Sequence, residues 1–257
     1  RKDLIVECLV ELFAPRGIYE RSDVAVRKKE GLEEQTGVLY GEVPDRVIIV
    51  ENGIKMAVDV KCGQKTGYFL DQKENRYAAR HYAKDKTVLD CFCNSGGFSL
   101  NCATVAKEVT AVDISQSALD SVNENASLNG FANVHTVCDD VFEALRKYKT
   151  ENRKFGLVIL DPPAFCKSAS EVKDAIRGYK DINILGLKLV EKGGYLISSS
   201  CSHYMTFPLF EKMLVEAAKE SGRIVRTMEI KSQAPDHPSL LCAEETQYLK
   251  FFVLQVI

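Results

Sequence analysis

Five short β-rich segments alternate with helical segments between residues 87 and 200. Strands and helices that alternate in this way form βαβ units and hence a mostly parallel sheet. A helix at 208–221 and two strands without a helix between them follow, and these strands predict an antiparallel pair at the sheet edge. We therefore expect an α/β protein with a seven-stranded, mostly parallel sheet. Its strands are predicted at 87–92, 108–113, 134–138, 156–161, 194–200, 224–231 and 248–257, and its helices between strands at 98–106, 115–129, 140–149 and 173–191.

The strand at 87–92 leads into a glycine turn, Asn94-Ser-Gly-Gly97, and then into a helix. Strand, glycine turn and helix in this order present backbone N–H groups to a nucleotide-like ligand. Glycine is expected there because a Cβ would block the ligand or forbid the dihedral angles of the turn. Many βα turns contain two glycines, so the turn by itself does not identify the ligand.

The first quarter of the chain has a different pattern. Residues 1–16 place their apolar side chains on one helical face and predict an amphipathic helix. The polar stretch around residues 27–29 suits either a solvated helix or loop or an RNA-facing patch. The Asn52-Gly53 step between two β-branched runs predicts a hairpin, with strands expected at 36–43, 46–51 and 54–60. We predict a small α+β auxiliary domain that faces RNA over residues 1–75 and a main domain over residues 76–257.

Residues 63–72 fit neither a helix nor a strand. They read Gly-Gln-Lys-Thr-Gly-Tyr-Phe-Leu-Asp-Gln and combine two glycines with two aromatic and several polar side chains. Loops of this composition often carry function. A helix is expected to begin near Asp71 and to carry Arg76, Tyr77 and Arg80 into the main domain.

The composition excludes several classes of protein. The 257 residues have a net charge of −2, so no global basic field points to nucleic acid, and any RNA contact must use a local basic patch or a domain outside this chain. Nine cysteines without a C-x-x-C pair indicate reduced thiols and no metal site. No apolar run approaches about 18 residues and no signal peptide is visible, which favours a cytoplasmic protein. The chain begins at Arg1 inside an expected helix, so we expect an upstream segment.

Acidic side chains stand where the next two strands end. Asp113 ends the strand at 108–113 and can accept hydrogen bonds from both hydroxyls of a ribose, as in proteins that bind NAD or S-adenosylmethionine (SAM). Ser115 is a natural N-cap for the helix that follows. Asp140 can bond an adenine amino group beside the apolar side chains of Val141 and Phe142. Equally, Asp139 or Asp140 can simply cap the next helix.

The most specific motif is Asp161-Pro162-Pro163, directly after the apolar strand at 156–161. Consecutive prolines hold the backbone extended, which presents Asp161 and the proline carbonyls to a flat base. Cys201 follows the next strand among serines and is a candidate nucleophile. C5 of cytosine becomes reactive when a thiolate adds to C6, and Asp161 can bond N3 and stabilise the adduct.

Together these motifs resemble those of class I SAM-dependent methyltransferases, which have a Rossmann-like fold. More narrowly, they are similar to the ribosomal large-subunit methyltransferase I type, which makes 5-methylcytosine in 23S rRNA. The resemblance covers essentially the whole chain. It rests on the segments 63–72, 90–98, 113–115, 140–142, 161–165, 178–183, 200–202 and 236–238.

The resemblance implies a SAM cofactor, a 23S rRNA partner and an RNA-binding PUA domain upstream of this chain. It implies that Asp90 and the turn bind the methionine part of SAM, that Asp113 binds the ribose and that Asp140 binds the adenine. Cys201 and Asp161 are carried over as catalytic residues. The expected cofactor residues are Phe69, Gln72, Asp90, Asn94, Gly96, Gly97, Asp113, Ile114, Asp140, Val141 and Asp161, and the expected substrate residues are Pro162, Pro163, Phe165, Tyr179 and Lys180.

One departure from related RNA cytosine methyltransferases concerns product release. Many of them have a second cysteine where this chain has Ala164, while Cys166 lies further into the loop. The base that removes the C5 proton therefore stays open between Tyr179, Lys180 and a water molecule. The oligomeric state, monomer or dimer, is open as well.

Three other functions compete with cytosine C5 methylation. Methylation of a guanine or adenine nitrogen in rRNA would need no thiol. A non-catalytic RNA-binding module would keep the cofactor pocket without turnover. An NAD-dependent dehydrogenase is disfavoured because the chain lacks G-x-G-x-x-G and would leave Asp161-Pro-Pro unexplained.

Overall fold

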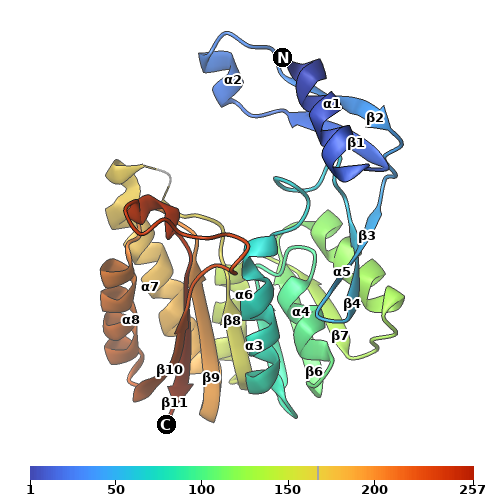
Figure 1. Ribbon diagram of the computed structural model, residues 1–257. Helices are drawn as coiled ribbons and strands as arrows, with labels where there is room; N and C mark the ends of the chain where they lie inside the picture. Colours follow the sequence, from blue (N-terminus) through green and yellow to red (C-terminus); the bar gives the residue numbers. More distant parts are fainter. Residues whose placement is uncertain (167) are drawn as a thin grey trace. The chain divides into compact units, whose positions relative to one another are not determined.

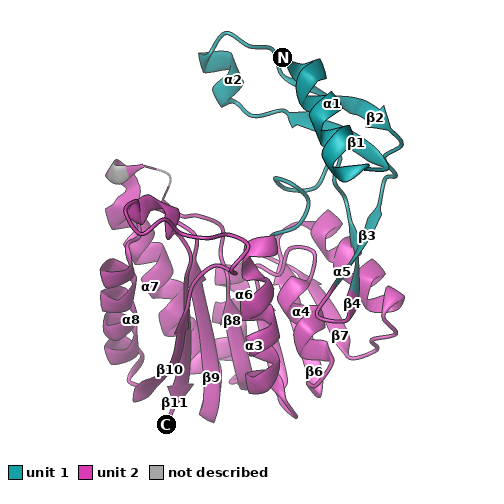
Figure 2. Ribbon diagram, viewed as in Figure 1, with its two compact units in different colours: residues 1–50, 55–69 teal, residues 51–54, 70–257 magenta. Residues whose placement is uncertain are grey.

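The structure is a computed structural model that describes residues 1–166 and 168–257 (Figure 1). The chain divides into two compact units (Figure 2). The first comprises residues 1–50 and 55–69, and the second comprises residues 51–54 and 70–257. The predicted domains, 1–75 and 76–257, stay a prediction, because units of dense contact need not be independent domains.

The first unit contains two helices, α1 (Lys2–Phe13) and α2 (Val26–Lys29). Strands β1 (Gly17–Ser22) and β2 (Gln35–Gly41) form an antiparallel pair. Strand β1 was not predicted, because all six of its residues are partly buried and the sequence shows no two-residue alternation there. The polar stretch around residues 27–29 falls in α2, a single helical turn.

The predicted hairpin at Asn52-Gly53 is present. Strands β3 (Val47–Glu51) and β4 (Ile54–Val58) form a two-stranded sheet. Asn52 and Gly53 have φ angles of 53° and 80°, the left-handed pair that a tight type I′ turn requires. The tip of this hairpin, residues 51–54, belongs to the second unit.

The second unit has the predicted seven-stranded sheet, with strand order β10-β11-β9-β8-β5-β6-β7. Strands β5 to β9 are parallel, whereas β11 runs antiparallel to both β9 and β10, which confirms the predicted pair at the edge. Strand β9 begins four residues before its predicted start, since it continues past a register shift opposite β8. The strands are β5 (Thr87–Cys91), β6 (Glu108–Asp113), β7 (Val134–Cys138), β8 (Phe155–Leu160), β9 (Val190–Ser200), β10 (Val225–Lys231) and β11 (Lys250–Val256).

Helices cover both faces of this sheet (Figure 1). One face packs against α3 (Lys73–Ala83), α4 (Gly97–Ala103) and α5 (Gln116–Leu128), and the other against α6 (Val141–Thr150), α7 (Val172–Leu189) and α8 (Phe207–Ser221). Strand β8 shows why: Leu157 and Ile159 join the first core, and Val158 and Leu160 join the second. A strand buried on both faces is apolar throughout, as the sequence 155–160 is. Short 3₁₀ helices lie at Leu70–Gln72, Ala169–Glu171 and Glu244–Thr246.

The strand order reverses at β5, which pairs with β6 on one side and β8 on the other. In open parallel sheets, ligands bind outside the carboxyl ends of the strands at such a switch point. The side chains singled out in the sequence, among them Asp90, Asp113, Asp161 and Cys201, stand at this carboxyl edge. In the described part of the chain, none of the helices combines the length and the apolar character needed to cross a membrane.

Candidate active site

The turn between β5 and α4 is built around two glycines with different tasks. Gly96 has a φ of 86°, the left-handed conformation that favours glycine. A Cβ added to Gly97 would lie 2.9 Å from Cδ of Arg76. Gly97 therefore makes room for an arginine under the turn.

Arg76 is held in place by a buried ion pair that the sequence analysis missed. Its guanidinium donates two hydrogen bonds of 2.6 Å to the carboxylate of Glu51, and both residues are less than 10% exposed. Bidentate pairs of this kind fix orientation as well as charge. Glu51 lies at the tip of the hairpin and Arg76 on α3. The ion pair thus fixes the Arg76 side chain against Gly97 of the turn.

Asp90 is 1% exposed, and its two carboxylate oxygens differ in their partners. Oδ2 accepts a 2.6 Å hydrogen bond from the Ser99 hydroxyl, whereas Oδ1 has no hydrogen-bond partner in the described part of the chain. Burial raises the pKa of Asp90 to about 7, and the carboxylates of Asp161 and Asp113 add to this rise. An unsatisfied buried acceptor beside the glycine turn fits a cationic donor such as the ammonium group of a methionine moiety.

Asp113 ties the end of β6 to the turn. Its Oδ2 accepts a hydrogen bond from the Asn94 amide at 2.9 Å, and its Oδ1 accepts one from the Ser115 amide at 3.0 Å. A carboxylate oxygen can accept a second hydrogen bond, so these bonds are compatible with ribose hydroxyls. Ser115 is the N-cap of α5, as predicted.

Asp140 has the capping role that the sequence left open as an alternative. Its Oδ1 accepts a 3.2 Å hydrogen bond from the Glu143 amide at the start of α6. Ile114 is 70% exposed beside the strand ends, whereas Val141 is only 3% exposed and belongs to the core. The contacts of these three residues with adenosine stay predictions.

Asp161 is joined to Gln72 by a hydrogen bond of 3.0 Å from Nε2 to Oδ1. Asn75, which is fully buried, orients the Gln72 amide with a 2.7 Å hydrogen bond to its Oε1. Burial raises the pKa of Asp161 to about 7, and Asp71 adds to this rise, while Arg76 and Gln72 oppose it. The structure thus brings together Gln72 and Asp161, two residues predicted from separate motifs.

Cys201 follows β9 and is partly exposed. Leu160 of β8 lies opposite Ser198 of β9, so Asp161 and Cys201 stand at neighbouring strand ends. The residues on either side of Cys201, Ser200 and Ser202, are buried, and both hydroxyls are hydrogen-bonded to the hydroxyl of Tyr179 at 2.9 and 3.0 Å. These hydrogen bonds connect the strand end that carries Cys201 to helix α7.

Lys250 is a further buried charged residue that was not predicted from the sequence. It is 1% exposed, and its ammonium donates 2.7 Å hydrogen bonds to the carbonyls of Ser202 and Tyr248. Burial lowers the pKa of Lys250 to about 8, and the charge of Cys201 opposes this effect. The available signal was a lysine within the apolar run of the last strand, since buried lysines are rare without a partner.

Several predicted substrate residues have partners within the protein, and their contacts with substrate stay predictions. Tyr179 is fully buried and packs against Phe165, with 4.7 Å between the ring centroids and 42° between the ring planes. Lys180 forms a 2.8 Å ion pair with Glu220 on α8. Pro162 is buried and Pro163 is exposed.

Phe69 and Cys166, which the sequence also singled out, have the following neighbours. Phe69 belongs to the first unit, where the Lys65 ammonium lies 5.2 Å from its ring centroid. Cys166 is 3% exposed, and its amide donates to the Ser202 hydroxyl at 3.4 Å. Cys166 thus helps to position the loop next to Cys201.

The strand order, the glycine turn and the acids at the ends of β5, β6 and β8 define a Rossmann-like enzyme that binds an adenosine-containing cofactor. The model of the S-adenosylmethionine-dependent methyltransferase family matches residues 22–251. The chain belongs to this family, and its cofactor is SAM.

Relatives in two bacteria carry a more specific name. The chain is 47% identical to the ribosomal RNA large subunit methyltransferase I of Aeromonas hydrophila, with 99% of this chain and 66% of the relative aligned. It is 48% identical to the protein of the same name from Pseudoalteromonas atlantica, over 100% of this chain and 66% of the relative. The chain thus spans 66% of the length of these relatives, and the resemblance found from the motifs is confirmed.

Solved structures agree with this assignment. A SAM-dependent methyltransferase from Streptococcus mutans superposes with a TM-score of 0.84 at 26% identity, covering 100% of this chain and 65% of that one. SMU.776, a methyltransferase complexed with S-adenosylhomocysteine (SAH), superposes with a TM-score of 0.83 at 26% identity, covering 100% of this chain and 66% of that one.

Proposed function

We propose that the protein transfers a methyl group from SAM to C5 of a cytosine in 23S rRNA through a covalent bond between Cys201 and C6. The names of the relatives support the rRNA substrate. The observation that carries the chemistry is the placement of a partly exposed cysteine and an aspartate at neighbouring strand ends. A thiol is required for C5 chemistry, whereas methylation of a base nitrogen needs none.

The residues present fit SAM at three points. Oδ1 of Asp90, which has no hydrogen-bond partner among the described residues, suits the ammonium group of the methionine part, next to the glycine turn. Asp113 would bind the ribose and Asp140 the adenine. When bound, SAM supplies an electrophilic methyl group, which the cytosine ring must be activated to accept.

Asp161 and Cys201 would activate the cytosine. The Cys201 thiolate adds to C6, and the electron pair of the C5–C6 double bond moves through the ring toward N3. Asp161, with a pKa of about 7, still holds a proton in a large share of molecules at neutral pH and can donate it to N3. The resulting enamine carbon, C5, would form a bond to the methyl carbon that SAM supplies. As the C4–N3 double bond re-forms, N3 would return its proton to the Asp161 carboxylate.

Product release requires that the C5 proton leaves and that the C6–S bond breaks. The electron pair of the C5–H bond re-forms the C5–C6 double bond, and the thiolate departs. Tyr179 is buried with its hydroxyl engaged, and Lys180 is paired with Glu220, so neither is placed to take the proton. We assign this step to a water molecule.

We assign a positioning role to Lys250. Its buried ammonium holds the carbonyl of Ser202, the residue after Cys201, and its positive charge favours the thiolate over the thiol. The charge of Cys201 also raises the pKa of Tyr179 and of Tyr248.

The test uses the full-length protein with SAM and 23S rRNA that contains 5-fluorocytosine. Fluorine at C5 cannot leave as a proton, so a C5 methyltransferase is trapped as a covalent protein–RNA adduct. We expect the adduct with the wild type and with Cys242→Ala, which changes an exposed cysteine, and none with Cys201→Ala. Methyl transfer to ordinary rRNA that survives Cys201→Ala, without an adduct in the wild type, would instead establish nitrogen methylation. SAM binding without any turnover would establish a non-catalytic RNA-binding module.

A further inference from the structure

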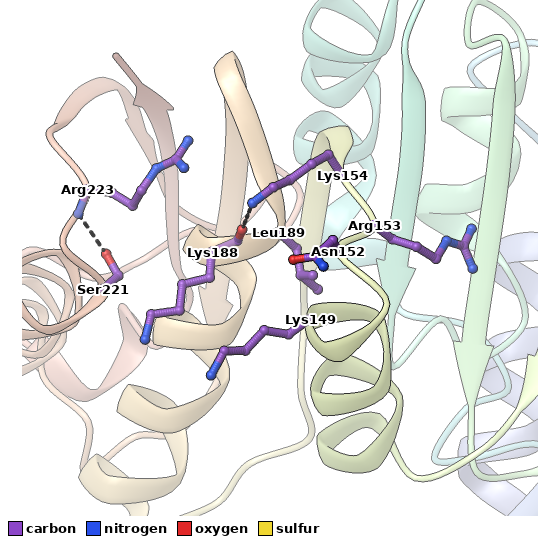
Figure 3. Close-up of a pocket in the computed structure, with 8 residues that line it drawn as sticks. All are labelled: Lys149, Asn152, Arg153, Lys154, Lys188, Leu189, Ser221 and Arg223. Atoms are coloured by element: carbon purple, nitrogen blue, oxygen red, sulfur yellow. Dashed lines mark hydrogen bonds between the residues drawn. The ribbon is translucent and has the colours of Figure 1, made fainter.

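A cavity of about 260 Å³ lies away from the cofactor site and is lined by five basic side chains (Figure 3). They are Lys149, Arg153, Lys154, Lys188 and Arg223, and the other lining residues that the structure describes are uncharged. We call this the basic cavity. Lys149 and Lys188 also line a second cavity, of about 290 Å³, together with the acidic Asp181 and with Arg146, which is paired with Glu143.

The basic cavity lies at the amino ends of the parallel strands, whereas Cys201 lies at their carboxyl ends. Its lining residues come from the end of α6, the end of α7 and the end of α8, directly before β8, β9 and β10 begin. In parallel strands such as β8 and β9, these positions are the amino ends. The basic cavity is therefore no part of the methyl-transfer site.

Positive charge is concentrated here rather than spread over the protein. Segments 146–154, 188–192 and 219–223 together contain nine Lys or Arg residues and three Glu residues, whereas the whole chain has a net charge of −2. In the described part of the chain, none of the five lining side chains is paired with a carboxylate. The rest of the chain is correspondingly acidic.

A simpler explanation is that the lysines offset the negative ends of three helices. Each helix C-terminus carries about −0.5 of a charge, so three of them offset about 1.5 charges, fewer than the five that line the cavity. Lys154 and Arg223 donate to the carbonyls of Lys188 and Val190. Burial and the neighbouring Arg223 lower the pKa of Lys154, which shows that like charges are held together here.

We propose that the basic cavity binds backbone phosphates of the RNA substrate, at a distance from the cytosine that is methylated. This inference rests on the proposed function, because it takes RNA as the substrate. Lys149 and Lys188 extend in the same direction in Figure 3 and would bind one phosphate between them. Arg153 also lines the basic cavity and lies over the Tyr148 ring, with 4.4 Å from its guanidinium carbon to the ring centroid.

The test is the salt dependence of RNA binding by the full-length protein. Each phosphate contact contributes about 0.7 to 0.9 to the slope of log K against log salt concentration. For the double variant Lys149→Glu/Lys188→Glu we expect a slope smaller by at least about 0.7 and an affinity for 23S rRNA at least about tenfold weaker at physiological salt. The matched control, Lys84→Glu/Lys107→Glu, makes the same charge change at exposed lysines that do not line the cavity.

Two further measurements separate this inference from its alternatives. SAH binding measured by calorimetry should be the same in all variants, which shows that the fold is intact. An unchanged RNA affinity and slope in Lys149→Glu/Lys188→Glu would overturn the proposal, and tight binding of inorganic phosphate or triphosphate with unchanged RNA binding would assign the cavity to a small anion instead. RNA binding is measured without methyl transfer, so failure of the adduct experiment and failure of this one remain distinguishable.

Discussion

At the scale of single residues, the carboxyl edge of the sheet contains acidic groups whose charged forms are disfavoured. Asp90 and Asp161 both have pKa values raised to about 7, with burial as the largest cause. A hydrogen bond to the carboxylate partly offsets the rise in each pKa: Ser99 donates to Asp90 and Gln72 donates to Asp161. Groups with such pKa values near neutral pH are typical of acid–base sites.

Asp161 should give the enzyme a pH-dependent loss of activity. In the proposed mechanism Asp161 donates a proton to N3, so kcat/KM should fall as pH rises through about 7, the pKa of this carboxyl group. Asp161→Asn keeps a hydrogen-bond donor but cannot transfer a proton, so we expect a rate about 10²- to 10⁴-fold lower without this basic limb. The pH profile of single-turnover methyl transfer measures both effects. Asp174→Asn, at an exposed acid on α7, is the control, and an unaltered profile in Asp161→Asn would exclude the proposed proton donor.

Lys250→Met tests the support of the thiolate. An unassisted thiol with a pKa of about 8.5 is only a few per cent ionised at pH 7, so we expect a rate about tenfold or more below wild type at that pH. Above about pH 8 the wild-type lysine loses its own charge, so the two rates should converge. Lys192→Met, at an exposed position, should match wild type throughout. A loss that is equal at every pH would mean that Lys250 only supports the loop.

At the scale of elements, position in the sheet decides which predictions succeed. Strands β5 to β8 are each short, rich in Val, Leu, Ile or Thr and followed by a turn, so they lie close to their predicted bounds. Strand β1 has no such pattern, and its existence depends on pairing with β2, from residues 35–41. The β5–α4 turn shows both cases. Its glycines can be identified from the sequence, but the packing of Arg76 against Gly97 depends on the fold.

Gly97→Ala should therefore affect the turn through packing. The added Cβ would lie 2.9 Å from Cδ of Arg76, which the Glu51 ion pair holds in place. Overpacking of this kind costs about 1–3 kcal/mol, and we expect weaker SAH binding together with a lower melting temperature. Gly37→Ala is the control, because a Cβ there meets nothing within 4 Å. Calorimetric SAH titration and thermal unfolding measure the two effects, and a variant with unchanged values for both would show that Arg76 can move aside.

At the scale of the whole molecule, the predicted cofactor site and the proposed phosphate-binding cavity lie in different parts of the second unit. The predicted SAM residues other than Phe69 belong to the second unit. With a net charge of −2, the proposed RNA binding would depend on local patches such as the basic cavity and on sequence that the longer relatives possess. Phosphate contacts supply much of the affinity for RNA.

We therefore predict that the 257-residue chain binds SAH as tightly as the full-length Aeromonas hydrophila relative and 23S rRNA more weakly. Calorimetry and filter retention on the same samples measure the two affinities. Equally tight RNA binding at physiological salt would contradict the prediction. A weaker affinity for SAH would place part of the cofactor site outside this chain.

The sequence by itself determined the class of fold and the residues that stand at the carboxyl edge of the sheet. Strand and helix periods are local properties, and an acid that follows an apolar strand must lie at that edge. Only the tertiary structure showed which partners these residues have. Glu51 meets Arg76 and Lys250 reaches Ser202 across 25 and 48 positions of the chain, and the basic cavity draws on the ends of three helices. Such contacts depend on how distant segments pack, and no local pattern encodes them.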